Sequence, residues 1–159
     1  MDVQHLLIDT FAYMPPAALL GDLSPEDASR RLNTVSHSIL DIVAHLNYWQ
    51  RWFLARLHSE AAPMAQSAAL GWPTLDATQW PTLSEEFLAG LQTATALGAD
   101  PARLTQPITP AIEFPPLAHY TVADVLAHIA VHNAHHLGQV VTLRQAFDLW
   151  PPPQGSFTW

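Results

Sequence analysis

The chain has 159 residues, 49% of them hydrophobic, and carries 14 acidic residues against 6 cationic ones, for a formal net charge of −8 at pH 7. A chain of this length is expected to form a single domain that spans residues 1–159. The hydrophobic fraction is enough for a packed core, which excludes a disordered chain. All 6 cations are arginines. We therefore expect no basic surface of the kind that binds nucleic acids or anionic membranes.

Cysteine is absent, which excludes disulfides, thiolate metal sites and a cysteine nucleophile. A transition metal would therefore have to be held by imidazole and carboxylate groups. The first residues carry no basic segment, so we expect no secretory signal, and no apolar run approaches the roughly 18–20 residues of a transmembrane helix. These features predict a soluble cytoplasmic domain.

Prolines divide the chain into segments with helical periodicity, and no segment shows the alternation of a strand. Four main helices are expected at about residues 3–20, 38–57, 82–98 and 121–147, with a short helical turn at 24–32. The first is expected to break or kink at Pro15–Pro16, and the third to begin at a cap on Thr82 or Ser84. With irregular connections at 60–82 and 101–116, this pattern predicts an all-α fold, a four-helix bundle with long loops.

The starts of several helices are marked by polar side chains. Ser38 with Asp41 resembles a capping box, with aspartate in place of the usual glutamate, and Thr121 with Asp124 marks another start. Ser24 precedes a proline, which is typical of an N-cap followed by the first helical position. Asp41 is therefore expected to be a helix cap rather than a metal ligand.

The chain contains 9 histidines, and 4 of them gather in one stretch of the last helix. His128, His132 and His136 recur every fourth residue, and each such step turns about 40° around a helix, so they form one slowly drifting stripe. The same stripe holds residues that suit a core-facing surface: Val125, Ile129, Gln139 and Leu143. His135 lies towards its edge. The stripe therefore predicts histidines on the face that enters the core.

Two imidazoles four residues apart on a helix can bind one divalent ion, but they need at least a third ligand. His45, in the predicted second helix, falls on a face with large apolar and aromatic side chains, and Tyr48 lies at its margin. An unpaired buried polar group costs on the order of 1–3 kcal/mol, and a metal shared by His45, His132 and His136 would satisfy all three rings. Zincin proteases have a glutamate where this chain has Asn133, so their motif is excluded.

These features also have plainer interpretations. A single histidine on an apolar face is more often a hydrogen-bonded core residue, and one pair at this spacing often arises by chance. The clustering, together with His45, favours a metal site. Trp49, Trp52 and Phe53 favour core packing over a substrate platform, and Arg144 is expected to be solvated or paired with the helix end. The remaining histidines are expected to be incidental: His5, His37, His58 and His119.

Residues 38–46, Ser-Ile-Leu-Asp-Ile-Val-Ala-His-Leu, with the aromatic cluster after them, resemble the second-helix motif of the DinB/YfiT-like superfamily. Residues 121–139 resemble the last-helix signature of the same superfamily. The resemblance implies an antiparallel four-helix bundle, commonly a homodimer, with a divalent metal at one end. Carried over by position, the metal ligands are His45, His132 and His136.

The relatives in this superfamily include thiol-dependent transferases and isomerases that use mycothiol or bacillithiol, and members described as metal-dependent hydrolases. Three neutral imidazoles leave a divalent ion open to water or substrate, and such an ion lowers the pKa of bound water to about 7, or the pKa of a bound thiol. We therefore predict an enzyme in which Zn²⁺ or Ni²⁺ activates a low-molecular-weight thiol or a water for attack on a small electrophilic substrate. No residue stands out as a dedicated general base, which favours the thiol.

Five residues are expected around the metal, as hydrogen-bonding or pocket groups: His128, Gln139, Asp41, Tyr48 and Trp49. The loop at 60–82, with Trp72 and Trp80, and the tail at 150–159 are expected to shape either the pocket mouth or a dimer interface. Two alternatives to catalysis stay open. One is a stress protein that binds a metal or a small ligand without turnover, and the other is a metal-free bundle with buried histidines.

Overall fold

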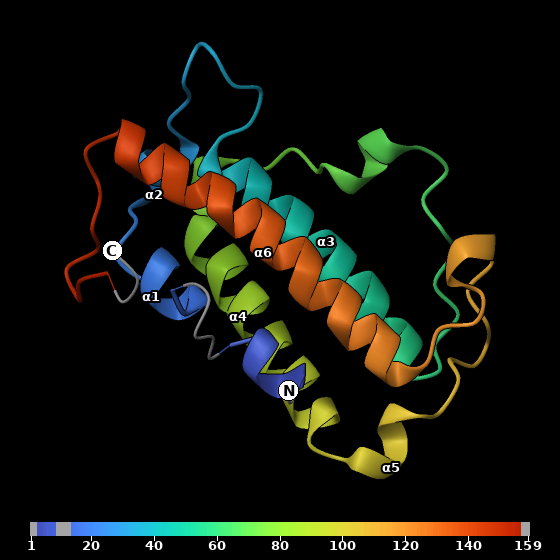
Figure 1. Cartoon of the computed structure of the whole chain (residues 1–159). Helices are drawn as coiled ribbons and strands as arrows, with labels where there is room; N and C mark the ends of the chain where they lie inside the picture. Colours follow the sequence, from blue (N-terminus) through green and yellow to red (C-terminus); the bar gives the residue numbers. More distant parts are fainter. Residues whose placement is uncertain (1–2, 9–13, 157–159) are drawn as a thin grey trace.

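The computed structural model describes residues 3–8 and 14–156, and within these ranges all regular secondary structure is helical. Three long helices dominate the fold: α3 (Ile39–Leu57), α4 (Trp80–Gly98) and α6 (Val122–Ala146) (Figure 1). Seven short helices lie before or between them: η1 (Val3–Leu6), α1 (Pro16–Leu20), α2 (Pro25–Ser29), η2 (Ala68–Gly71), η3 (Ala77–Gln79), α5 (Pro101–Leu104) and η4 (Pro115–Leu117). The predicted all-α fold is confirmed.

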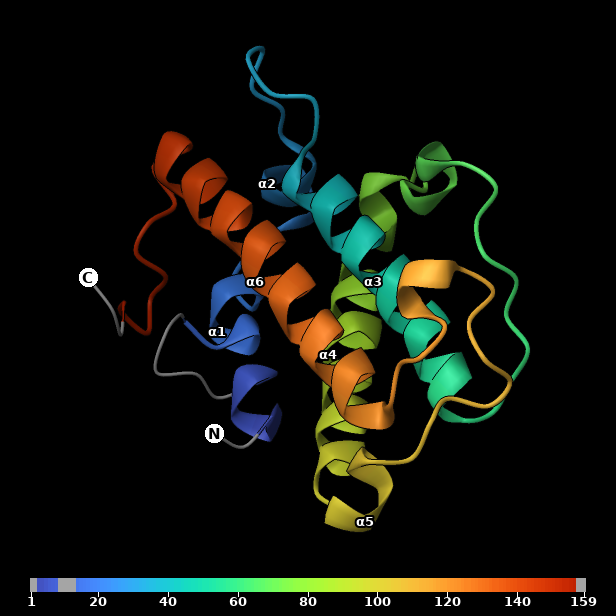
Figure 2. The same ribbon diagram turned by 45° about the vertical axis from the view of Figure 1, so that its right-hand side comes forward.

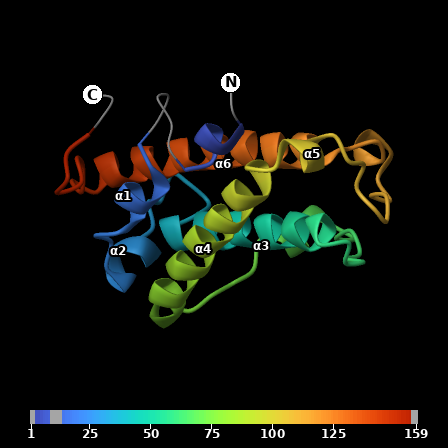
Figure 3. The ribbon, with the colours of Figure 1, turned by 90° about the horizontal axis from the view of Figure 1, so that it is seen from below.

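The three long helices pack together, with α3 and α6 side by side and antiparallel, as Figures 1 and 2 show. The connection at 58–79 carries the chain back from the end of α3 towards the end at which α3 begins. As a result α4 runs in the same general direction as α3, and Figure 3 shows it crossing the α3–α6 pair at an angle. A helical bundle needs such a long crossover connection wherever two consecutive helices run in the same direction.

The N-terminal segment supplies the fourth side of the bundle. Here η1 packs against α4 and α6, and α1 packs against α4. The predicted helix at 3–20 is thus replaced, in the described residues, by two short helices, and its residues 9–13 lie outside the described part of the chain. The turn predicted at 24–32 begins at Pro25 and already ends at Ser29. In the described residues the bundle therefore consists of three long helices and a side made of short helices, where four long helices are expected from the sequence.

Reciprocal side-chain caps set the starts of α3 and α6. The Ser38 hydroxyl accepts a hydrogen bond from the Asp41 amide at 3.2 Å, and the Asp41 carboxylate accepts one from the Ser38 amide at 2.8 Å. Thr121 and Asp124 form the same pair at the start of α6. Each pair satisfies two backbone donors that the first helical turn leaves free. Both predicted helix starts are confirmed.

The start of α4 differs from the prediction of a cap at Thr82 or Ser84. Asp76 and Gln79 form a capping box around η3, which continues directly into α4 at Trp80. The Trp80 indole is buried and donates a hydrogen bond to the Leu23 carbonyl at 2.8 Å. The cap therefore lies on the preceding 3-10 turn, a position that a search for a single N-cap misses.

The core is a continuous cluster of aliphatic and aromatic side chains from all three long helices. Trp52 and Phe53 are buried in it, which confirms the packing role predicted for them, and Trp49 is half-buried at its edge. None of the helices in the described residues is long and apolar enough to span a membrane.

Arg144 lies inside the protein, with 0% of its surface exposed, and the prediction of a solvated side chain is wrong. Its guanidinium donates to both carboxylate oxygens of Asp22, at 2.7 and 2.8 Å. It also donates to the backbone carbonyls of Leu19 and Leu149. These bonds tie the end of α6 to the turn between α1 and α2. Leu19 and Asp22 lie more than 120 residues away in the sequence, so helical periodicity could not reveal them.

We expect Arg144→Gln to lower the free energy of unfolding by about 3–5 kcal/mol, because it breaks a buried ion pair and leaves two carbonyls without donors. Urea denaturation at pH 7 measures this loss. Arg51→Gln is the matched control, since its guanidinium is 71% exposed and pairs only loosely with Glu86. The free energy of unfolding of this control should stay within about 1 kcal/mol of that of the unsubstituted protein. Equal losses in the two variants would contradict the structural role of Arg144.

The same pair predicts a pH dependence. Hydrogen bonds from Arg144 hold the pKa of Asp22 below its ordinary value of 3.8. The ionised carboxylate therefore stabilises the folded state in full above that pH, and this contribution is lost as the pH falls through the lower pKa of the folded state. The difference in stability between the unsubstituted protein and Arg144→Gln should accordingly narrow in acid.

Candidate metal centre

Three histidines from two helices converge between α3 and α6. His45 belongs to α3, whereas His132 and His136 lie one turn apart on α6, and one ring nitrogen of each lies within 4.8 Å of the others. The Nε2 atoms of His45 and His132 are 3.1 Å apart. Two nitrogens bound to one tetrahedral Zn²⁺ at about 2.0–2.1 Å lie roughly 3.3 Å apart, so this spacing suits a shared ion.

Outer hydrogen bonds orient two of the three rings. The Nδ1 atom of His45 lies 2.7 Å from the Gly71 carbonyl, and Nδ1 of His136 lies 2.8 Å from the Gln139 side-chain oxygen. Because both partners are acceptors, Nδ1 carries the proton in each ring and the lone pair falls on Nε2. This arrangement is typical of metal-binding histidines, whose second nitrogen donates to a carbonyl or carboxylate.

The rings are also held in the neutral form that binds metals. Burial, helped by the neighbouring histidines, lowers the pKa of His132 to about 3. Burial is likewise the main cause that lowers the pKa of His45 and of His136. At neutral pH all three imidazoles are therefore uncharged, which is the form that binds a metal ion.

An aromatic stack from the 58–79 connection covers this site. Trp72 lies parallel to the His45 ring at 3.9 Å between centroids, and His37 lies parallel to Trp72 at 3.8 Å. Since both rings sit at the same short distance from the indole, they occupy its two faces. The expectation that His37 is incidental is therefore wrong. Trp72 lies against the site, and the sequence leaves its loop open between the pocket mouth and a dimer interface.

Gly71 is the supporting residue that sequence analysis missed. A Cβ atom at this position would lie 2.6 Å from Nε1 of Trp49 and 3.0 Å from its Cε2 atom. Glycine thus allows the chain to pass against the Trp49 indole while its carbonyl reaches His45. Trp49 therefore packs against the segment that orients a histidine. A lone glycine in an irregular loop carries no periodic signal that could have pointed to this role.

The other predicted pocket residues lie in different places. The ring of His128 lies 6.5 Å from the ring of His132, and its Nδ1 lies 3.2 Å from the Tyr120 hydroxyl. Asp41 caps α3 and pairs with Arg31 at 2.8 Å, in agreement with its predicted capping role. Tyr48 lines a separate cavity between α3 and α4. Of the five, only Gln139 hydrogen-bonds one of the three converging histidines in the described residues.

The fold and the site together define a class of protein, an all-helical protein with a three-histidine group between two antiparallel helices. A family model described as the DinB superfamily matches residues 16–140, a range that contains all three of these histidines. The chain therefore belongs to the DinB superfamily, as the two helix motifs predicted. Comparison with curated proteins and with solved structures finds no match.

We expect Gly71→Ala to weaken Zn²⁺ binding by about 10- to 100-fold, because the added methyl group forces the Trp49 ring or the Gly71 carbonyl away from its place. Competition with a chromophoric chelator measures the affinity. Gly138→Ala is the matched control, since nothing lies within 4 Å of a Cβ at this position on the same helix as two of the histidines. The control should keep its affinity, and a parallel loss in both variants would contradict the role of Gly71.

The histidine pKa values predict how the metal-free protein responds to acid. The unfolded chain binds protons on these histidines near their ordinary pKa of 6.5, whereas the folded state holds His132 neutral down to about 3. The free energy of unfolding should therefore be highest above the ordinary pKa of the unfolded state. It should decline as the pH falls towards the lower pKa of the folded state. The melting temperature of His132→Gln should decrease less between pH 8 and about pH 4 than that of the unsubstituted protein. Identical declines would show that His132 titrates normally.

Proposed function

We propose that this protein is a metal-dependent enzyme in which His45, His132 and His136 hold one divalent ion, with Zn²⁺ or Ni²⁺ as the first candidates. The observation that carries the proposal is the convergence of one nitrogen from each ring within 4.8 Å. The outer bonds of His45 and His136 add to it, because they turn Nε2 towards the same point. A merely structural cluster of histidines has no need of that orientation.

The composition of the ligand set supports catalysis over a purely structural site. In the described residues the candidate ligands are three imidazoles and no carboxylate or thiolate joins them. Neutral ligands leave the full positive charge on a bound divalent ion, and three of them leave a position open for a further ligand. When bound, such an ion lowers the pKa of a thiol or water and so supplies a nucleophile at neutral pH.

The residues of this chain supply orientation and shielding. Gln139 and the Gly71 carbonyl hold protons on the outer nitrogens of two rings, and Trp72 excludes water from one face of His45. None of the described contacts gives the site a carboxylate that could accept a proton from water. A thiol needs less help from a base, so we propose thiol activation for attack on a small electrophile ahead of hydrolysis.

A second candidate function is metal or small-ligand binding without turnover. The observation that favours it is the stack of His37 and Trp72, which closes one side of His45. The two functions differ in whether the metal-loaded protein turns over substrate.

We expect the protein to bind about one equivalent of Zn²⁺ or Ni²⁺, and His45→Ala to lose at least about 100-fold in affinity, because two neighbouring histidines alone make an incomplete site. Isothermal titration calorimetry measures the stoichiometry and the affinity. His58→Ala, which removes an exposed histidine at the end of α3, should bind like the unsubstituted protein.

Turnover then separates the two candidate functions. The metal-loaded protein is assayed with a panel of low-molecular-weight thiols and small electrophiles, and with esters for hydrolysis. A rate that requires both thiol and metal, and that His45→Ala abolishes, supports the enzyme. Tight metal binding without any rate favours the binding protein, and absence of metal binding would contradict both the enzyme and a metal-binding protein.

A further inference from the structure

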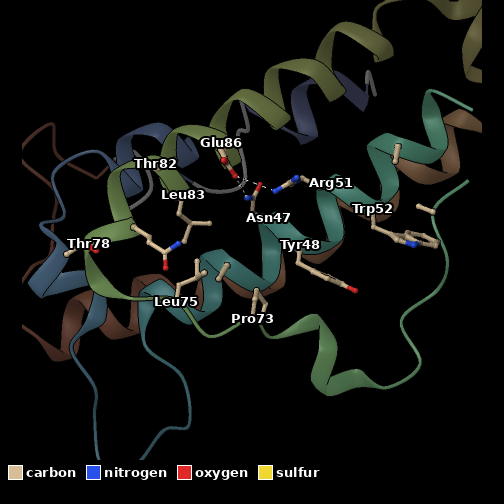
Figure 4. A pocket seen from close by; sticks show the side chains of 14 residues that line it. Asn47, Tyr48, Arg51, Trp52, Pro73, Leu75, Thr78, Thr82, Leu83 and Glu86 are labelled. Atoms are coloured by element: carbon tan, nitrogen blue, oxygen red, sulfur yellow. Dashed lines mark hydrogen bonds and ion pairs between the residues drawn. The ribbon is translucent and has the colours of Figure 1, made fainter. Parts of the chain in front are cut away.

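A cavity that is separate from the histidine cluster opens between α3, α4 and the end of the connection that joins them (Figure 4). Its volume is about 800 Å³, within the range of small-molecule sites. The residues that line it do not include His45, His132 or His136. The two sites therefore share α3 but use different faces of it, since the histidines meet on the side where α6 packs.

The walls of this cavity divide into an apolar part and a polar part. Tyr48, Leu75 and Leu83 give it an apolar surface. Asn47 and Glu86 lie on the polar side, and Figure 4 shows their side chains meeting across the gap between α3 and α4. An apolar wall with a few placed polar groups is the usual composition of a site for a small organic molecule.

Asn47 has an unused hydrogen-bond acceptor. Its side-chain nitrogen donates to the Glu86 carboxylate at 3.1 Å, and only 5% of the residue is exposed. Because a carboxylate accepts hydrogen bonds, this contact fixes which end of the amide is nitrogen. The other end, Oδ1, is buried without a partner. Because solvent does not reach this oxygen, a ligand in the cavity meets the Glu86 carboxylate that Asn47 holds, and not Oδ1 itself.

Glu86 can take a second cation beside Arg51. The Arg51 guanidinium lies 3.7 Å from the Glu86 carboxylate, and the two side chains are 71% and 50% exposed. An ion pair that is this long and this exposed contributes little, so it does not block a competitor. The net charge of −8 adds a general attraction for cations. Glu86 therefore presents a charged acceptor at the polar end of the cavity.

We propose that this cavity binds a small primary amine that carries an aromatic or branched aliphatic body. The ammonium group donates to the Glu86 carboxylate, which the Asn47 side chain holds in place, and the body packs against Tyr48, Leu75 and Leu83. The Tyr48 ring adds a surface that is favourable to both an apolar body and a nearby cation. This site does not depend on a metal, and it is independent of the function proposed for the histidines.

The test uses the full chain, made metal-free with EDTA, and phenethylamine as the probe. Calorimetric titration should give saturable binding of the amine, and 2-phenylethanol, which has the same body without the charge, should bind about tenfold more weakly or worse. In a ¹H–¹⁵N spectrum the side-chain NH₂ of Asn47 should shift on addition of the amine. Equal affinity for the amine and the alcohol would overturn the proposal.

Two neighbouring acidic residues provide the matched variants. Glu86→Gln should weaken phenethylamine binding by about tenfold, since it removes the charged acceptor and keeps an oxygen for Asn47. Glu85→Gln makes the same change of charge at an exposed position outside the cavity and should bind normally. His45→Ala should also bind normally. An equal effect of the two glutamate changes, or loss of binding in His45→Ala, would contradict the cavity as the amine site.

Discussion

The antiparallel packing of α3 against α6 is the constraint on which the rest of this structure depends. It sets His45 of one helix against His132 and His136 of the other, so that the three converging rings come from helix positions about 90 residues apart. The capping boxes begin the two helices, and Arg144 anchors the far end of α6 against the α1–α2 turn. A slip of either helix along the other would move His45 away from His132 and His136.

The connection between α3 and α4 completes both of the sites that flank α3. Its carbonyl at Gly71 orients His45 and its indole at Trp72 covers the same ring, whereas its later residues close the cavity that Tyr48 lines. A segment without long helices thus contributes contacts to both candidate sites. This fits the general pattern in which a rigid helical frame positions irregular segments that bear the functional contacts.

The features of this molecule that the sequence could predict are those with local physical signals. Capping residues marked the starts of α3 and α6, and a spacing of four residues placed His132 and His136 on one face. Long-range partners leave no such signal, so the sequence predicts Arg144 to be solvated or paired with the helix end and does not reveal its bonds to Leu19 and Asp22. Gly71 contacts His45 through a backbone carbonyl, which every residue type possesses. The sequence therefore carries no signal for this contact, apart from the need for a small residue beside Trp49.

We propose above all that His45, His132 and His136 bind one divalent ion through Nε2. The most direct test is a crystal grown with Zn²⁺, examined by anomalous diffraction at the zinc absorption edge. We predict one strong peak about 2.0–2.1 Å from the Nε2 atom of each ring, with Nδ1 of His45 still on the Gly71 carbonyl. A peak held by other side chains, or no peak among these rings at saturating Zn²⁺, would contradict the account.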